Sequence, residues 1–523
     1  GIAPRRFGLH RAALLLLLLA GAARADELDF RPPASPTDPA TAEIMRDLAV
    51  RVLPVYQDKD PLRFLSTVSA LQMAARNYTA ATVTRRTLRE RRRGGNAGRP
   101  AREVFFDVYA QARAVEGEQR LAFATSLSRA YAANVAPLDD HDAYAVTALL
   151  DAPPASYADA LQGAFDRQRS RDAIGQEEAV ALIWTYLDYD AHRSMAPLAA
   201  SLEAAEEQRR YVSEKPLQLR VTGGGALSVR VVRPRQAGKP LPALLEFNID
   251  PSRDFTRENA AHGYAGVVAY VRGRFKGQGA VVPYQFDGAD ARRVIDWIVR
   301  QPWSDGRVGM FGDRYSGFAA WAALERRPAA LQAVATAMPT APGIDAPMAG
   351  NVFQNSAFRW SLYVTQREPD ADRRFYDDAL WRALDQKWYR SGRRYRDLGL
   401  LYGTPNPLFI RWLNHPSYDD FWQRMIPYRA QFARIDIPVL TISGYFAGSQ
   451  PAALYYFNEH LRHDPKARHT LLIGPYDDAA IQRGALPTLQ GYAVDAAALL
   501  DLRELRYQWF DHVLKGGAAP AVL

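Results

Sequence analysis

The stretch VGMFGDRYSGFAAWAAL occupies residues 308–324 and decides how the rest of the chain is interpreted. Its first residues, Val308–Phe311, form a short apolar run that is typical of a buried strand. Gly312–Gly317 is rich in small residues and leads into an apolar segment, Phe318–Leu324, which favours a helix. A strand that ends in a sharp glycine-containing turn and opens a helix has the geometry of a nucleophile elbow. Arg314 occupies the apex of this predicted turn.

Strand-like and helix-like segments alternate on both sides of this stretch. Short β-rich runs predict strands at Leu217–Val221, Leu227–Val232, Ala243–Phe247, Gly263–Val271, Ala333–Ala337, Pro438–Ser443 and His469–Ile473. Apolar periodicity predicts helices at Asp287–Gln301, Ala452–Leu461 and Leu499–Leu514. Alternation of this kind predicts a mostly parallel sheet with helices on both faces.

Two regions depart from the alternation. Residues 341–433 are rich in aromatic residues and arginine, so we interpret them as a helical cap inserted into an α/β core of residues 212–340 and 434–516. Residues 26–211 place apolar residues at three- and four-residue spacing, which predicts an all-helical N-terminal region. The helices expected there include Thr41–Leu53, Pro61–Arg76, Arg102–Ala114 and Glu118–Ala132.

The first 25 residues have the layout of a secretory signal peptide. Arginines at positions 5, 6 and 11 precede the apolar run Ala12–Ala20, and Ala23-Arg24-Ala25 has the pattern of a cleavage site. This run is too short to span a bilayer, and no later stretch reaches 18 apolar residues. We therefore expect an exported protein, periplasmic or secreted, without a mature membrane span.

The amino-acid composition excludes several classes of site and partner. The 523 residues contain no cysteine, which excludes disulfides, thiolate metal sites and cysteine nucleophiles. The net charge of +9 falls to +5 once the four arginines of the first 25 residues are removed. The arginine run Arg89–Arg93 has no interleaved aromatic residues and is interpreted as a solvated helix end. We therefore expect no nucleic-acid partner, and the lack of metal-ligand spacing predicts neither a metal nor a cofactor.

The sequence around the predicted elbow resembles the Xaa-Pro dipeptidyl-peptidase and cocaine-esterase-like hydrolases. The resemblance rests on Val271-Arg272-Gly273, on Asp287–Ala291, on the block QPWSDGRVGMFG at residues 301–312, and on Tyr315 and Gly317 of the pattern G-x-S-Y-x-G. It covers about residues 216–516 and implies an α/β-hydrolase core with a helical cap and a Ser–Asp–His triad. It also implies a small acyl ester, an amide or a proline-containing peptide as ligand. Relatives usually continue into a β-sandwich, so residues 517–523 are expected to be the start of a truncated one.

All three triad positions that the resemblance assigns carry other residues. The serine position is Arg314, the acid position is Ala447, and the histidine position is Asp478. A guanidinium has no lone pair with which to attack a carbonyl, and alanine cannot orient a base. Aspartate lacks the near-neutral pKa and the two ring nitrogens of histidine. The backbone N–H of Tyr315 is expected to survive as one oxyanion-hole donor, whereas residues 247–250 lack the tyrosine that supplies the second donor in relatives.

These substitutions predict a pseudoenzyme, an exported α/β-hydrolase-fold protein that does not catalyse the family reaction of serine hydrolysis. The alternative is an active serine hydrolase or peptidase whose recorded sequence carries triad substitutions. A rearranged triad is disfavoured, because Ser316 lies where the turn needs a small residue and His469 begins a strand. We further expect Arg314 and Asp478 to form a salt bridge that plugs the former active site. The alternative is that Arg314 pairs with Asp313 or points into solvent.

Overall fold

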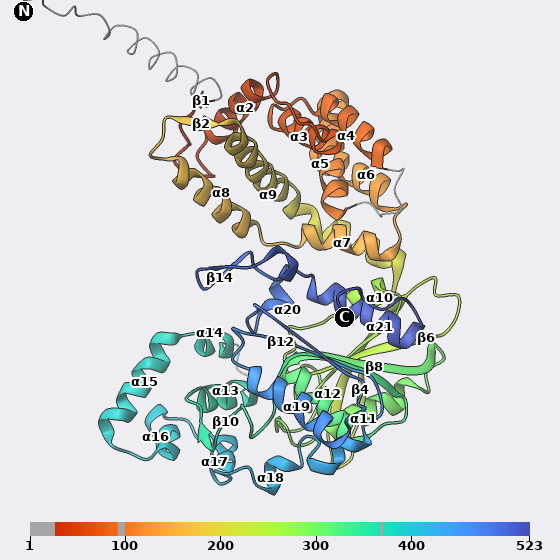
Figure 1. Cartoon of the computed structure of the whole chain (residues 1–523), viewed down its shortest axis with the longest axis vertical. Coiled ribbons are helices and arrows are strands. Elements are labelled where there is room, and N and C mark those ends of the chain that lie inside the picture. The colour runs from red at the N-terminus through yellow and green to blue at the C-terminus, as the bar shows by residue number, and fades with distance from the viewer. Residues whose placement is uncertain (1–26, 93–99, 367–369) are drawn as a thin grey trace, which may run out of the picture. The chain divides into compact units, whose positions relative to one another are not determined.

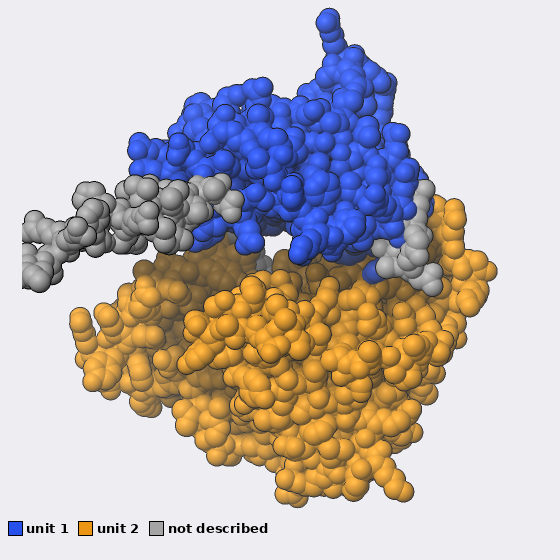
Figure 2. Space-filling model, turned by 45° about the horizontal axis from the view of Figure 1, so that its top comes forward, with its two compact units in different colours: residues 1–209 blue, residues 210–523 orange. Residues whose placement is uncertain are grey.

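Figure 1 shows a computed structural model of the chain, which describes residues 27–92, 100–366 and 370–523. The predicted signal peptide, residues 1–25, lies outside the described residues. Two compact units, residues 1–209 and 210–523, make up the chain (Figure 2). Among the described helices, none combines the length and the hydropathy that a bilayer-spanning segment requires.

The N-terminal unit is built from helices. They are α2 (Thr41–Val52), α3 (Pro61–Ala74), α4 (Tyr78–Arg92), α5 (Ala101–Gln119), α6 (Phe123–Val135), α7 (Asp140–Leu150), α8 (Pro154–Gln168) and α9 (Gln176–Arg210). Asp60 begins α3 by accepting hydrogen bonds from the backbone N–H groups of Leu62 and Arg63, with Pro61 at the first helical position. The apolar faces of these helices share one buried core.

The expectation of an all-helical N-terminal region is wrong in one detail. Strands β1 (Glu27–Asp29) and β2 (Ala173–Gly175) pair antiparallel, with Leu28 opposite the buried Ile174. Each strand has three residues, which is too short for an alternating pattern to be recognised. The pairing joins the start of this unit to the segment that precedes α9.

Two arginines of the run at 89–93 form ion pairs within the helical unit. The Nη1 atom of Arg89 lies 2.9 Å from a carboxylate oxygen of buried Asp107, and the Nη2 atom of Arg92 lies 2.8 Å from a carboxylate oxygen of Glu103. Asp107 also accepts a 2.6 Å hydrogen bond from Nε of buried Arg85. These contacts join α4 to α5, so Arg89 and Arg92 act as helix-packing residues.

The second unit contains a nine-stranded, mostly parallel sheet. Its strands are β3 (Tyr211–Ser213), β4 (Leu217–Arg220), β5 (Ala226–Pro234), β6 (Leu241–Asn248), β7 (Ala265–Tyr270), β8 (Ser304–Arg314), β9 (Leu331–Pro339), β12 (Val439–Gly444) and β13 (His469–Gly474). Their order is β13-β12-β9-β8-β6-β7-β5-β3, with β4 paired to β5. The pairs from β13 through β7 are parallel, and those involving β5 are antiparallel. The predicted α/β-hydrolase type of sheet is confirmed.

Helices cover both faces of this sheet. They are α10 (Thr256–Ala261), α11 (Asp287–Ile298), α12 (Tyr315–Arg326), α19 (Gln450–His463), α20 (Ala480–Arg483) and α21 (Leu502–Lys515). Leu245 of β6 faces the core shared with α11, α12 and α19, while its neighbour Leu244 faces the core shared with α21. This alternation follows from the two-residue period of a strand. Burial on both faces explains the nearly continuous apolar runs of β6, β7 and β12.

The cap lies between β9 and β12 in the chain and is drawn in cyan and light blue in Figure 1. It contains a short hairpin, β10 (Met348–Ala349) and β11 (Val352–Phe353), followed by helices. These are α13 (Ser356–Thr365), α14 (Ala371–Phe375), α15 (Asp378–Ser391), α16 (Leu398–Tyr402), α17 (Pro407–Leu413) and α18 (Asp420–Gln423). Several of its aromatic residues form a core of the cap's own around Phe358, Trp381 and Phe409. Beyond α21, residues 517–523 form no strand.

Candidate active site

The turn between β8 and α12 has the sharp geometry of an elbow. Arg314 lies at its apex with φ 48° and ψ −110°, a combination that is costly for a residue with a side chain. The neighbouring glycines make the turn sterically feasible. A Cβ atom at Gly312 would lie 2.5 Å from the Cβ atom of Ser316, and one at Gly317 would lie 3.0 Å from the Cα atom of Pro339. Arg314 is therefore the residue that this strained turn presents.

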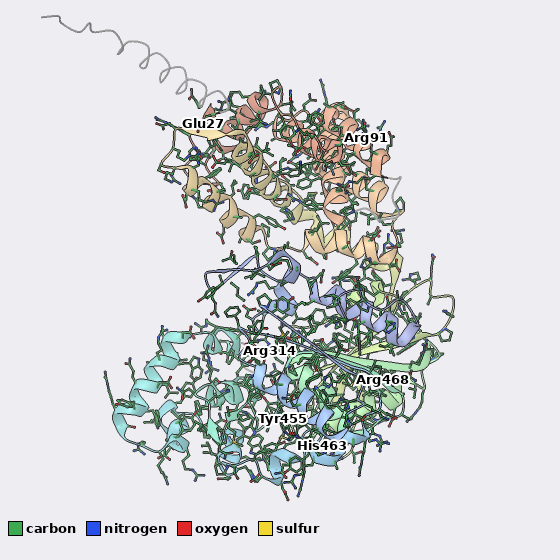
Figure 3. The ribbon with its side chains drawn as sticks, viewed as in Figure 1. Glu27, Arg91, Arg314, Tyr455, His463 and Arg468 are labelled. Atoms are coloured by element: carbon green, nitrogen blue, oxygen red, sulfur yellow. The ribbon has the colours of Figure 1, made fainter. Side chains whose placement is uncertain are left out.

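The side chain of Arg314 extends from the end of β8 and is half exposed, at 51% (Figure 3). Its Nε atom lies 3.7 Å from Oδ2 of Asp313, which is beyond hydrogen-bond distance. Asp478 instead binds the loop that precedes α19. It accepts hydrogen bonds from the backbone N–H of Gly448 at 2.7 Å and from the backbone N–H of Ser449 at 3.3 Å, and a further one from the Ser449 hydroxyl.

The expected salt bridge between Arg314 and Asp478 is therefore wrong. The positive end of the α19 dipole and the N–H groups before that helix attract the Asp478 carboxylate. A half-exposed arginine would have to lose side-chain freedom to compete with these donors. The alternative, in which Arg314 lies beside Asp313 and reaches solvent, matches the structure.

Ala447, at the acid position, is buried in the loop between β12 and α19. The adjacent residue, Gly448, is one of the donors to Asp478, so the predicted acid and histidine positions lie close together. The loops after β12 and β13 are also in direct contact, since a Cβ atom at Gly444 would lie 2.0 Å from the carbonyl oxygen of Tyr476. Ala447 and Asp478 therefore lie close together. Ala447 offers only a methyl group, and the Asp478 carboxylate is already hydrogen-bonded to the loop.

A buried ion pair fixes the residue before the apex. Asp313 receives hydrogen bonds from both terminal nitrogens of Arg253, one of them at 2.9 Å, and from Nε2 of Gln482 at 2.8 Å. Burial acts to raise the pKa of Asp313, but the Arg253 guanidinium outweighs it and holds that pKa below its usual value. Gln482 belongs to α20, so this network also ties the segment after Asp478 to the elbow. Sequence reasoning missed Arg253 and Gln482, because neither lies in a recognisable motif.

The sequence of the α/β unit is similar to that of known hydrolases. Residues 223–477 match the model of the X-Pro dipeptidyl-peptidase (S15 family). Cocaine esterase from Rhodococcus sp. (strain MB1 Bresler) is 29% identical over 273 residues, which cover 48% of this chain and 46% of the esterase. These matches support the X-Pro dipeptidyl-peptidase and cocaine-esterase-like family for the α/β unit. The chain thus spans about half the length of cocaine esterase.

Other similarities are shorter or more remote. A putative serine esterase of Mycobacterium bovis (strain ATCC BAA-935 / AF2122/97) is 34% identical over 139 residues, which cover 26% of this chain and 20% of that protein. A selenomethionine-labelled α-amino acid ester hydrolase has a TM-score of 0.46 and 19% identity, covering 60% of this chain and 56% of its own. An aminopeptidase from a marine sediment archaeon (Thaumarchaeota archaeon) has a TM-score of 0.46 and 20% identity, with the same coverage.

The two predicted oxyanion-hole positions differ in the hydrogen-bond donors that they provide. Tyr315 is the first residue of α12, so its backbone N–H has no partner within the helix. Its side chain is buried, and its hydroxyl donates a 2.6 Å hydrogen bond to Asp287. On the other side, the amide group of Asn248 donates to Glu246, while its oxygen accepts from the backbone N–H of Ile249. The loop after β6 therefore uses the amide of Asn248 for its own structure.

Ser316 has a structural role. Its buried hydroxyl lies 2.9 Å from Oε1 of Glu246 and 3.1 Å from the carbonyl oxygen of Asp313. Its partner Glu246 is a carboxyl of β6, so this contact holds the start of α12 against the sheet. Burial raises the pKa of Glu246 to about 7, so that about half of this carboxyl stays protonated in neutral solution.

Two histidines that could supply a base, His460 and His469, bind groups outside the elbow. The Nε2 atom of His469 lies 2.8 Å from the hydroxyl of Thr441, and its Nδ1 atom lies 3.1 Å from Nδ1 of His460. Burial lowers the pKa of His469 to about 3, so the ring stays neutral. In the N-terminal unit, Asp139, His141 and Asp142 bring three potential metal ligands together, but these do not belong to the elbow.

A carboxyl that the sequence did not single out lies near the histidine position. Asp345 follows β9 in the chain and accepts a 2.8 Å hydrogen bond from the backbone N–H of Ala341. Burial raises the pKa of Asp345 to about 7, and the negative charge of Asp478 adds to this effect. The surroundings of position 478, the predicted histidine position, therefore contain two carboxyl groups and no imidazole base among the contacts described above.

Glu246→Gln tests the protonation of the buried carboxyl behind the elbow. The folded-state pKa of Glu246 lies above its unfolded value, so its stabilising contribution is complete in acid and is lost as pH rises from about 4.5 to 7. Glutamine keeps the acceptor for Ser316 and does not titrate. We expect Glu246→Gln to raise the free energy of unfolding in urea relative to wild type at pH 8, by about 1–3 kcal/mol, and by less at pH 5. A difference that does not change between the two pH values would contradict the assignment.

Proposed function

We propose that the α/β unit is a non-hydrolytic member of the X-Pro dipeptidyl-peptidase and cocaine-esterase-like family. The proposal rests chiefly on Arg314, which occupies the apex of a retained elbow. A guanidinium cannot form the acyl-enzyme intermediate of a serine hydrolase, because it has no free lone pair for attack. The fold and the turn thus remain while the nucleophile is missing.

The surrounding groups support the same conclusion. A substitute mechanism would need a base that activates water beside the apex. Asp313 is bound by Arg253 and Gln482, and Asp478 is bound by the loop before α19. Ala447 has no group that could orient a base. The proposed protein would bind an acyl ester, an amide or a proline-containing peptide of the family's type and release it unchanged.

Turnover of p-nitrophenyl butyrate by the purified chain tests this proposal. We expect no saturable hydrolysis by the unmodified protein, and the same low rate from Arg314→Ala, because Arg314 is not a nucleophile. Saturable turnover that a fluorophosphonate abolishes would overturn the proposal. Resequencing of the coding DNA is the matching check on the alternative, since serine, aspartate and histidine codons at 314, 447 and 478 would favour an active hydrolase.

Export is a second proposal and rests on residues 1–25 alone. Recovery of the protein from the periplasm or the medium with Asp26 as its first residue would support it. Recovery of a cytoplasmic protein that retains these residues would contradict it.

A further inference from the structure

The helical cap contains a cleft that is separate from the elbow. The cleft has a volume of about 660 Å³ and is lined by residues between Arg394 and Ile410, which include none of the three triad positions. Its walls come from the end of the α15–α16 connection, from α16 and from the start of α17. A concave site of this size is within the range that holds a small organic ligand.

The lining of the cleft includes apolar side chains. Leu400 has 73% of its surface exposed, Ile410 is half-buried, and Phe409 is buried beneath the surface. An exposed leucine on the surface of a concave, apolar site gains free energy when a ligand covers it. This lining therefore favours a hydrocarbon or an aryl group.

The backbone holds this lining in place. Gly403 ends α16 with φ +88°, a conformation that favours glycine. Asn406 begins α17, with its side-chain oxygen accepting a hydrogen bond from the backbone N–H of Phe409 at 3.1 Å. Its amide group donates to the Ser361 hydroxyl of α13 at 2.8 Å. These contacts form the cleft before any ligand is bound, which limits the entropy that binding would cost.

Arg394, Arg396 and Asp397 are the charged residues that line the cleft, so its net charge is positive. Arg394 is 77% exposed, and its contacts within the described part of the chain are long ones, of 3.4 and 3.5 Å, with the carboxylate of Asp397. Arg396 donates one 3.0 Å hydrogen bond to the side-chain oxygen of Asn414. Each guanidinium has five N–H donors, so both have donors to spare. The preceding segment, KWYRSGRRYR at residues 387–396, is rich in basic residues and contains no acidic one.

We propose that this cleft binds an amphipathic carboxylate. The carboxylate would accept hydrogen bonds from Arg394 and Arg396, and its hydrocarbon tail would lie against Leu400 and Ile410. The planar, forked guanidinium matches a carboxylate well, and the concave shape suits one small molecule better than a flat bilayer. Lipid phosphate shares part of this chemistry, so the experiment includes it as a separate arm. The proposal does not depend on the loss of hydrolysis at the elbow.

Titration calorimetry of the full chain with octanoate tests the proposal. We expect saturable binding at one site, weakened at least tenfold by the double substitution Arg394→Gln/Arg396→Gln. The matched control, Arg382→Gln/Arg390→Gln, removes the same charge from exposed positions of α15 outside the cleft and should keep the wild-type affinity. Octan-1-ol has the same tail without the charge, so the double substitution should change its affinity less than twofold. Circular dichroism checks that each variant is folded.

Two more variants and a vesicle experiment distinguish the cleft from the elbow and from a membrane surface. Leu400→Ser keeps both arginines and should weaken octanoate and octan-1-ol alike, and it tests the cleft even if the arginine variant fails to fold. Arg314→Ala should leave octanoate binding unchanged. The proposal is overturned by the absence of saturable binding, by equal losses in the two arginine pairs, or by loss of binding in Arg314→Ala. Flotation with phosphatidylglycerol vesicles that octanoate does not compete away would overturn it in favour of a membrane surface.

Discussion

The triple substitution Arg314→Ser, Ala447→Asp and Asp478→His is expected to produce saturable ester hydrolysis about 10³-fold faster than that of the unmodified chain. In a serine protease, removal of the triad costs about 10⁶ in turnover. Because the second oxyanion donor is expected to be missing, the turnover regained by the triple variant should be lower by a factor of about 10²–10³. The gain depends on the retained elbow and on the proximity of positions 447 and 478, which the 2.7 Å hydrogen bond between Asp478 and Gly448 shows.

The single substitution Arg314→Ser is the control for this experiment. It supplies a hydroxyl at the apex without a base, so its turnover should remain near that of the unmodified chain. Equal rates for the single and triple variants would contradict the assignment of positions 447 and 478 to the acid and the base. A folded triple variant without turnover would show that the loops after β12 and β13 no longer assemble a triad.

Arg253→Ala is expected to destabilise the α/β unit by about 3–5 kcal/mol. The reason is that Asp313 is buried and carries a lowered pKa, so removal of its guanidinium partner leaves a charge without compensation. Gln482 would remain as a donor to Asp313, but it carries no charge. Urea unfolding at neutral pH, followed by a probe within residues 210–523, measures the change.

The control for Arg253→Ala is Arg483→Ala. Arg483 pairs with Asp477 at 3.0 Å on a partly exposed surface, and loss of such a pair costs about 0–1 kcal/mol. A second check combines Arg253→Met with Asp313→Leu, which removes both charges and should recover most of the loss. If Arg253→Ala costs no more than Arg483→Ala, the ion pair does not stabilise the elbow.

The strand–turn–helix at residues 308–324 could be predicted because its information is local. The apolar run, the glycines and the helical spacing follow one another directly in the sequence. The resemblance of residues 301–312 to the hydrolase family then predicts the fold of the surrounding unit. The boundaries are less accurate, since β8 spans Ser304–Arg314 and includes polar residues that pair with neighbouring strands. The sequence pattern predicts a helix that ends at Ala114, but α5 continues through Gly117 to Gln119. Gly117 is exposed there, and the low helix propensity of a single glycine, about 1 kcal/mol, is not enough to end the helix.

The contacts of the candidate site could not be predicted in the same way, because they join residues that are far apart in sequence. Arg253 and Asp313 are 60 residues apart, and Gln482 is 169 residues from Asp313. The expected pairing of Arg314 with Asp478 rests on the hydrogen bond between these positions in an active relative. It fails because the carboxylate finds backbone donors at the start of α19, which the sequence pattern does not reveal.

Labelling with a fluorophosphonate probe, followed by intact mass measurement, is the most direct test of the proposed loss of acyl transfer. The unmodified chain is expected to gain no adduct, whereas the triple variant should gain one adduct, located at residue 314 by peptide mapping. A stoichiometric adduct on the unmodified chain would contradict the proposal.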